Sequence, residues 1–255
     1  MMQVRSYDNL ITRLEAIADS PNVEMDHLGD FDAAGRTYPL YLMQMGEPDP
    51  GRKKVMIAAG IHGDEPAGVE AAIRFMEINS GNADLLSRFH FTIFPCNNPS
   101  GYELNTRENA DGIDLNRQFA ARKPAPEVKI ITEALQGKCF DLVFEMHEDI
   151  DAPGLYLYEI ADDPSMHVGE KILESVAAAG YPVNVNPIIE GLPAKGGLIR
   201  RNRIRFRKTR LPQAIYTYRT CGGHVITLEP PVAVLPIEDR VKIELLALDL
   251  ALSVT

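Results

Sequence analysis

The sequence predicts an α/β fold in which one β-sheet is covered by helices on both faces. Short apolar runs without polar alternation, such as residues 55–59, are typical of strands that are buried on both faces. These runs alternate along the chain with segments whose apolar residues recur at helical spacing. No internal repeat, low-complexity tract or linker breaks this pattern, so we expect residues 1–255 to form one domain.

Each element is predicted from its own local pattern. Leu10, Leu14 and Ile17 recur at helical spacing after the candidate N-cap Ser6, and the other helices are predicted in the same way. Gly35 lies in the turn of a predicted hairpin. In chain order after the first helix, we expect hairpin strands at 23–31 and 38–45, a strand at 55–59, a helix at 69–76, a strand at 89–94, a helix at 127–135, strands at 141–146 and 155–160, a helix at 166–179, a strand at 225–228 and a helix at 237–252.

Composition and charge exclude several functional classes. Apolar residues make up 45% of the chain and charged residues 24%, which is typical of a soluble globular protein. The formal net charge of −10 argues against general binding to nucleic acids or to anionic membranes. The chain starts with polar sequence and contains no apolar run of the roughly 20 residues that span a membrane. We therefore expect a cytoplasmic protein.

The cysteines point to the same compartment. Cys96, Cys139 and Cys221 are odd in number and share no C-x-x-C spacing. This pattern is typical of buried free thiols in a reducing compartment, and neither a disulfide framework nor a thiolate zinc site is expected.

Four residues at predicted strand ends form a candidate metal site. His62 and Glu65 follow one buried strand, and His147 ends another. Two histidines and a carboxylate can bind zinc and leave the fourth position open for water. Glu229 ends a further apolar strand, where a carboxylate can act as a general base. If the four residues converge, the protein is a metallohydrolase.

Spacing alone does not establish this site, because about one H-x-x-[DE] match is expected by chance in such a composition. The chain also contains His27 with Asp30, in a predicted hairpin strand where the two side chains fall on opposite faces. His167 with Glu170 lies on a predicted helix, on its solvated side. The strand-end position favours the middle match, since open α/β sheets place their sites there. A lone histidine such as His147 is otherwise more often a hydrogen-bonded core residue.

Taken in order, the motifs resemble the zinc carboxypeptidase family of metallopeptidases. The segments that carry the resemblance are His62-Gly63-Asp64-Glu65, Asn98-Pro99-Ser100-Gly101-Tyr102, Arg107, the run from Gly112 to Phe119, His147, and Thr227-Leu228-Glu229. The resemblance spans residues 55–231 and implies a mixed, mostly eight-stranded sheet flanked by helices.

The resemblance also implies a role for each matching residue. It implies one zinc ion that is bound by His62, Glu65 and His147, with Glu229 as the general base. Arg107 matches the arginine that polarises the scissile carbonyl. Asn116 and Arg117 match the pair that holds the terminal carboxylate of the substrate. A catalytic tyrosine of the digestive members has no clear counterpart, and Tyr216 and Tyr218 are the candidates.

With Gly-Asp between His62 and Glu65, the first ligand loop resembles that of one branch of the family. This branch contains murein tripeptide amidases, aspartoacylases and succinylglutamate desuccinylases. Aspartoacylases and succinylglutamate desuccinylases usually carry an additional C-terminal β-rich domain. Only a predicted helix follows Glu229, so we expect no such domain here. This favours a peptidase or a peptide amidase.

Residues 200–210 are strongly basic in an otherwise acidic chain. Arg203, Arg205 and Arg207 would share one face of a strand. The segment is either an edge strand protected by charge against aggregation or a specificity loop that favours acidic substrates.

The leading functional prediction is zinc-dependent hydrolysis of an amide bond next to a free carboxylate, in a small peptide. The alternatives are an N-acyl-amino-acid deacylase on the same metal site, or a non-catalytic binding protein whose basic segment contacts an acidic partner. The oligomeric state, and a second metal near Asp64 or Asp149, stay open.

Overall fold

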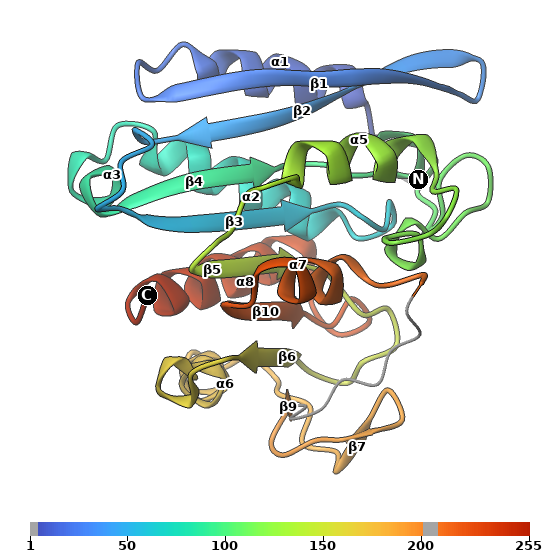
Figure 1. Ribbon diagram of the computed structural model, residues 1–255. Coiled ribbons are helices and arrows are strands. Elements are labelled where there is room, and N and C mark those ends of the chain that lie inside the picture. The colour runs from blue at the N-terminus through green and yellow to red at the C-terminus, as the bar shows by residue number, and fades with distance from the viewer. Residues whose placement is uncertain (1–4, 201–208) are drawn as a thin grey trace.

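The structure is a computed structural model in which residues 5–200 and 209–255 are described. An eight-stranded sheet runs through the molecule in the order β1-β2-β4-β3-β5-β10-β6-β9 (Figure 1). Its strands are β1 (Val23–Ala33), β2 (Arg36–Met45), β3 (Lys53–Ala59), β4 (Phe89–Phe94), β5 (Leu142–Met146), β6 (Tyr156–Ala161), β9 (Leu198–Arg200) and β10 (His224–Glu229). The short strands β7 (Ile188–Ile189) and β8 (Leu192–Pro193) form a separate pair.

The sheet is mixed. Strands β4, β3, β5 and β10 pair in parallel, whereas β1 with β2, β2 with β4, and β6 with β10 pair antiparallel. The parallel centre consists of the apolar runs that the sequence analysis assigns to doubly buried strands. The predicted mixed eight-stranded sheet flanked by helices is therefore confirmed.

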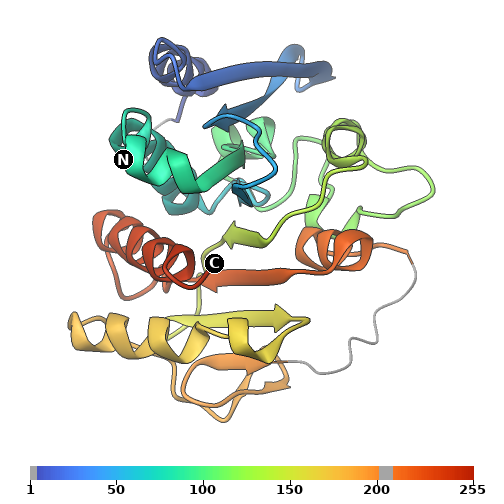
Figure 2. The same cartoon turned by 60° about the vertical axis from the view of Figure 1, so that its left-hand side comes forward.

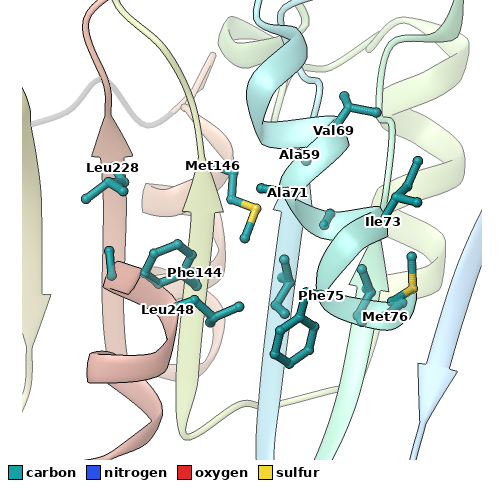
Figure 3. Close-up of a cluster of buried hydrophobic side chains, with 14 of the residues drawn as sticks. Ala59, Val69, Ala71, Ile73, Phe75, Met76, Phe144, Met146, Leu228 and Leu248 are labelled. Atoms are coloured by element: carbon teal, nitrogen blue, oxygen red, sulfur yellow. The ribbon is translucent and has the colours of Figure 1, made fainter. Parts of the chain in front are cut away.

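Helices cover both faces of the sheet, as Figure 2 shows nearly edge-on. One layer contains α1 (Tyr7–Ala18), α2 (Pro66–Asn79), α6 (Gly169–Ala178) and α8 (Ile237–Leu252), and the other contains α5 (Pro126–Leu135) and α7 (Gln213–Cys221). Phe144, Met146 and Leu228 pack against α2 and against Leu248 of α8 on the first face (Figure 3). Val143 and Val225 pack towards α5 and α7 on the second face. Alternate side chains of each central strand thus enter two different cores.

Several elements differ from the sequence-based expectation. The helices α3 (Ala83–Arg88) and α4 (Pro99–Leu104), each of six residues, and the nine-residue α7 were not predicted. Helix α4 begins where Asn98 caps it by accepting a hydrogen bond from the N–H of Gly101. The helix predicted at 166–179 begins only at Gly169, after the 3-10 turn η2 (Pro164–Met166).

The prediction of three free thiols is wrong. Cys139 and Cys221 form a disulfide, and only Cys96 is free and buried. Cys139 precedes β5 and Cys221 ends α7 directly before β10, so the two residues meet where these neighbouring strands begin. Their separation of 82 residues conceals this proximity in the sequence.

Within the described ranges, no helix combines the length and the apolar character that crossing a bilayer requires.

Candidate active site

The strands β5 and β10 place one ligand candidate and the general-base candidate side by side. Glu145 pairs with Thr227 in parallel register, and the N–H of His147 donates to the carbonyl of Leu228 at 3.0 Å. Because side chains alternate along a strand, His147 and Glu229 project from the same face as Glu145 and Thr227. The carboxyl ends of these strands lie on the right in Figure 1.

The loop after β3 brings the other two ligand candidates to the same place. Its tight course requires Gly63, because a Cβ there would lie 1.9 Å from the carbonyl carbon of Gly101. Pro66 then begins α2 directly after Glu65. His62 and Glu65 are therefore held between the sheet and the start of a helix, and each is 3% exposed.

The carboxylate of Glu65 lies between two imidazoles. Its Oε1 is 2.5 Å from Nδ1 of His62, and its Oε2 is 2.8 Å from Nδ1 of His147. Potential ligand atoms of the three residues lie within 4.8 Å of one another. This donor set fits Zn²⁺, which in catalytic sites takes three protein ligands and keeps one position open.

The outward nitrogen of each histidine faces a second carboxylate. Nε2 of His62 is 3.5 Å from Oδ1 of Asp114, and Nε2 of His147 is 3.8 Å from Oε2 of Glu145. Such carboxylates orient metal-binding histidines and fix the tautomer that exposes the other nitrogen to the ion. Neither acid was predicted from the sequence to have a role in the site. The signals were present, since Asp114 precedes Asn116 by two residues and Glu145 shares the strand face of His147.

Glu65 and Glu229 have opposite pKa shifts. Burial alone would raise the pKa of Glu65, but the charges of His62 and His147 outweigh it and lower the pKa. Burial raises the pKa of Glu229, against the lowering effect of His147. A divalent cation at the triad would add positive charge beside Glu229 and lower its pKa towards the range of a general base.

Arg107 faces the ligand cluster from the side of the loop. Its NH1 lies 3.6 Å from Oε1 of Glu65, and its NH2 lies 3.4 Å from Oδ2 of Asp114. The side chain is 41% exposed, so the guanidinium remains accessible to a ligand in front of the cluster.

The 3-10 turn η1 (Leu115–Arg117) presents two further donors. Asp114 caps this turn by accepting a hydrogen bond from the N–H of Asn116 at 2.9 Å. Oδ1 of Asn116 accepts a hydrogen bond from the N–H of Gln213 at 2.8 Å, which assigns the amide NH₂ as the donor end. Arg117 donates through NH1 to the carbonyl of Asn116 at 2.9 Å and is exposed.

A cavity of about 560 Å³ connects these groups. Every residue that the sequence analysis assigned to the site lines it, together with Glu145 and Thr227 on the strands. One cavity therefore contains a metal-binding cluster, a carboxylate outside that cluster, and several cationic or amide donors.

The tyrosine candidates do not lie in this cavity. The ring of Tyr216 packs against Phe119, and the hydroxyl of Tyr218 donates to Asp162 at 2.7 Å. The tyrosines that line the cavity are Tyr156 and Tyr158 of β6. They face it because β6 pairs with β10, which the sequence alone does not reveal.

Behind the metal-ligand cluster, Glu148 follows the end of β5 and contacts the helices α2 and α8. Its Oε2 accepts a hydrogen bond from the N–H of Ala67 at 2.7 Å, and its Oε1 pairs with buried Arg240 of α8. Burial raises the pKa of Glu148 to about 7, although Arg240 acts in the opposite direction. These contacts fix the start of α2, which directly follows Glu65, relative to His147.

The other two H-x-x-[DE] matches lie away from the cavity. The expectation that His27 and Asp30 point to opposite faces is wrong, because a bulge between His27 and Gly29 brings them to 2.8 Å. The pair is nevertheless about half exposed. His167 precedes α6 rather than lying on a helix, and Glu170 is 59% exposed.

Most of the basic segment falls outside the described residues, including Arg203, Arg205 and Arg207. Arg200, at the end of β9, donates through Nε to buried Glu159 at 2.8 Å. The preference for acidic substrates stays a prediction.

The family model of the zinc carboxypeptidases matches residues 23–137. This matched segment contains His62 and Glu65 but ends before His147 and Glu229. Murein peptide amidase A of Escherichia coli K12 is 39% identical over 77 residues, which are 29% of this chain and 28% of that protein. Carboxypeptidase E of Caenorhabditis elegans is 32% identical over 105 residues, which are 32% of this chain and 22% of that protein. The matches thus span less than a third of these relatives.

Solved structures resemble the chain over nearly its whole length. A candidate metallopeptidase from Shewanella baltica has a TM-score of 0.82 at 24% identity and covers 97% of this chain and 91% of its own. A metallo-carboxypeptidase from Burkholderia cenocepacia has a TM-score of 0.70 at 23% identity, covering 98% of this chain and 68% of its own. At these identities the likeness concerns the fold.

The likeness to the solved structures shows that the fold is that of the metallopeptidases. The candidate metal ligands in the sequence are consistent with this fold. The resemblance to the zinc carboxypeptidase family is confirmed, with a murein peptide amidase among the relatives as expected.

Proposed function

We propose that the protein is a zinc-dependent hydrolase that cleaves an amide bond next to a free carboxylate, with residues 1–255 acting as one catalytic domain. The observation that carries the proposal is the presence of the ligand cluster and the donors Arg107, Asn116 and Arg117 in one cavity. A metal site alone would fit many hydrolases, whereas adjacent carboxylate-binding donors favour a substrate with a terminal carboxylate.

One zinc ion would be held by His62, Glu65 and His147. When bound there, it would lower the pKa of a water molecule towards neutrality and polarise the scissile carbonyl. The closely spaced donor atoms support this assignment, as do the carboxylates behind both histidines.

Glu229 is proposed to move the protons of the reaction. It would accept a proton from the attacking water and later donate it to the leaving amine. Its position beside His147 and outside the ligand cluster supports this role. Burial favours a carboxylate that can be both protonated and deprotonated near neutral pH once positive charge is adjacent.

The arginines and the amide are proposed to orient the substrate. Arg107 would donate to the developing oxyanion, a contribution worth about 3 kcal/mol for one such donor. Asn116 and Arg117 would hold the terminal carboxylate, the guanidinium through two N–H groups and the amide through a third. This arrangement fixes which bond lies in front of Glu229.

A deacylase that acts on N-acyl-amino acids is the second candidate. It needs the same zinc site, the same general base and the same donors for a substrate carboxylate. The relatives are named as carboxypeptidases and as a murein peptide amidase, which favours peptide substrates. A binding protein without catalysis would not need Glu229 beside the ligand cluster.

The test is a cleavage assay of zinc-loaded protein with three matched substrate sets. These are peptides with a free C-terminus, the same peptides amidated at the C-terminus, and N-acetyl and N-succinyl amino acids. We expect cleavage of the free peptides, loss of activity on amidation, and reversible inhibition by a chelator. Preferred release of acetate or succinate would establish the deacylase instead, and equal cleavage of amidated peptides would contradict the role of Asn116 and Arg117.

A further inference from the structure

A buried hydrogen bond joins Asn116 to the start of α7. The N–H of Gln213, the first residue of this helix, donates to Oδ1 of Asn116 at 2.8 Å. Backbone donors in the first turn of a helix have no partner within the helix, so Asn116 satisfies one of them. In return, the helix fixes the orientation of the Asn116 amide. An amide turned by half a rotation would present its oxygen to a substrate carboxylate and repel it.

The side chain of Gln213 connects this turn to the sheet. Nδ2 of Asn97 donates to Oε1 of Gln213 at 2.9 Å, and both residues are 1% exposed. The N–H of Asn97 donates in turn to the carbonyl of Ala59 at 3.0 Å. Ala59 is the last residue of β3, the strand that leads to His62. The position of the Gln213 N–H is therefore set from the strand that carries the metal-ligand loop.

Packing alone does not explain a glutamine at position 213. Its Nε2 is buried and has no hydrogen-bond partner within the described parts of the chain. An unsatisfied buried donor lowers stability, so stability alone favours an apolar residue of the same size. Pro212 and Ala214 line the cavity, whereas Gln213 between them does not. The contacts of Gln213 thus indicate a role that is exerted through Asn116 and not through direct contact with a substrate.

We propose that Gln213 is a positioning residue for recognition of the substrate carboxylate. Its N–H holds the amide of Asn116 with the donor end free, and its side chain holds that N–H in place through Asn97. The inference rests on the proposed function, because Asn116 must bind the carboxylate for its orientation to matter.

The experiment compares the binding of leucine and leucinamide to zinc-loaded protein by calorimetry. The ratio of the two affinities measures how well the carboxylate is recognised. We expect wild-type protein to bind leucine about 100-fold more tightly, as for two hydrogen bonds to a charged group. Gln213→Leu keeps the N–H but loses the contact with Asn97, and the ratio should fall about 10-fold.

Gln213→Pro removes the N–H itself and should lower the ratio at least as much. Proline is tolerated at the first position of a helix. The preceding residue, Pro212, has a ψ of 154°, which is the extended conformation that a residue before proline adopts. The substitution therefore removes the donor to Asn116 at a position where the backbone accepts proline.

Thr217→Val is the matched control on the same helix. Thr217 is buried one turn further along, and its hydroxyl donates to the carbonyls of Gln213 and Ala214. Its loss should leave the ratio at the wild-type value. Asn97→Leu should lower the ratio as much as Gln213→Leu, and the double variant should lower it no further, because both changes remove the same contact.

An unchanged ratio in Gln213→Leu and Gln213→Pro would overturn the proposal. An equal fall in Thr217→Val would also overturn it, because the loss would then reflect a general disturbance of α7. If Gln213→Pro does not fold, Gln213→Leu and Asn97→Leu still decide the question. All variants should retain zinc, since none of the substituted residues is a proposed ligand.

Cleavage of peptides with a free C-terminus is measured in the same proteins. Gln213→Leu should raise KM about 10-fold with little change in kcat, as for a contact made equally in the ground state and the transition state. A preference for leucine that depends on Gln213, without cleavage of any peptide, would support the positioning role and refute the proposed hydrolysis. Cleavage with a preference that does not depend on Gln213 would refute only the positioning role.

Discussion

His147 and Glu229 are neighbours at the ends of two parallel strands, joined by the 3.0 Å hydrogen bond from the N–H of His147 to the carbonyl of Leu228. The backbone ladder, rather than a flexible loop, therefore sets the distance between a metal-ligand candidate and the proposed general base. A site built on sheet backbone holds its groups more rigidly than one built on loops. The consequences can be tested at residues that support this geometry.

The first prediction concerns Glu159, a buried carboxylate that joins four elements. It accepts hydrogen bonds from the N–H groups of Val168 and Gly169, from Arg200, and from His224 at 3.1 Å. Glu159→Gln leaves the partly buried guanidinium of Arg200 and several buried donor groups with a neutral partner. We expect the free energy of unfolding at pH 7 to fall by about 3 kcal/mol. Denaturant titration measures this change.

The same residue predicts a pH dependence. Burial raises the pKa of Glu159, but hydrogen bonds from His224, Val168 and Arg200 lower it to about 2, against 4.5 for a free glutamate. Because the folded pKa is the lower one, the stabilisation is present above pH 4.5 and is lost as the pH falls from 4.5 to 2. Wild-type protein should therefore lose more stability than Glu159→Gln across this window. Glu170→Gln is the control, since Glu170 binds the same Arg200 at 3.4 Å but is 59% exposed, and its loss should change stability by less than about 1 kcal/mol.

The second prediction concerns the carboxylate behind His62. Asp114→Asn keeps an N-cap for η1, since asparagine also caps helices, but removes the negative charge beside Nε2 of His62. We expect zinc affinity to fall about 10- to 100-fold, as measured by competition with a chromophoric chelator. Asp111→Asn changes a nearby exposed acid and should leave the affinity unchanged. Equal affinities for all three proteins would show that Asp114 does not support the ligand.

The third prediction concerns the contact between Gly63 and Gly101. Gly63→Ala inserts a methyl group where only 1.9 Å is available, so the loop that carries His62 and Glu65 must move. We expect a loss of about 2 kcal/mol in stability, which is typical of an overpacked interior, together with weaker zinc binding. Gly81→Ala adds the same group in open space and should do neither. Calorimetric unfolding with and without zinc distinguishes the variants.

The sequence predicts the sheet and the metal cluster because both leave local signals. The apolar runs that end at Ala59, Met146 and Leu228 indicate core strands, and the residues that follow them face one sheet edge. The cavity wall formed by β6 leaves no such signal, since its position beside β10 results from tertiary packing. Tyr156 and Tyr158 could therefore not be assigned from the sequence.

The cysteine prediction failed for the same physical reason. Cys139 and Cys221 precede two strands that become neighbours only in the folded sheet. The His27 prediction failed differently, because a single bulge in β1 reversed the expected alternation of faces. Local patterns predict elements, whereas contacts between distant segments and irregularities within a strand require the structure.

The most direct test of the account is a paired measurement of zinc content and turnover for Glu229→Gln and Glu65→Gln. Glu229→Gln should retain one zinc ion per chain and lose at least about 100-fold in kcat, as expected for removal of a general base. Glu65→Gln should lose both zinc and activity, whereas His27→Ala, at an exposed H-x-x-D match, should lose neither. Near-normal turnover by a zinc-loaded Glu229→Gln protein would contradict the account.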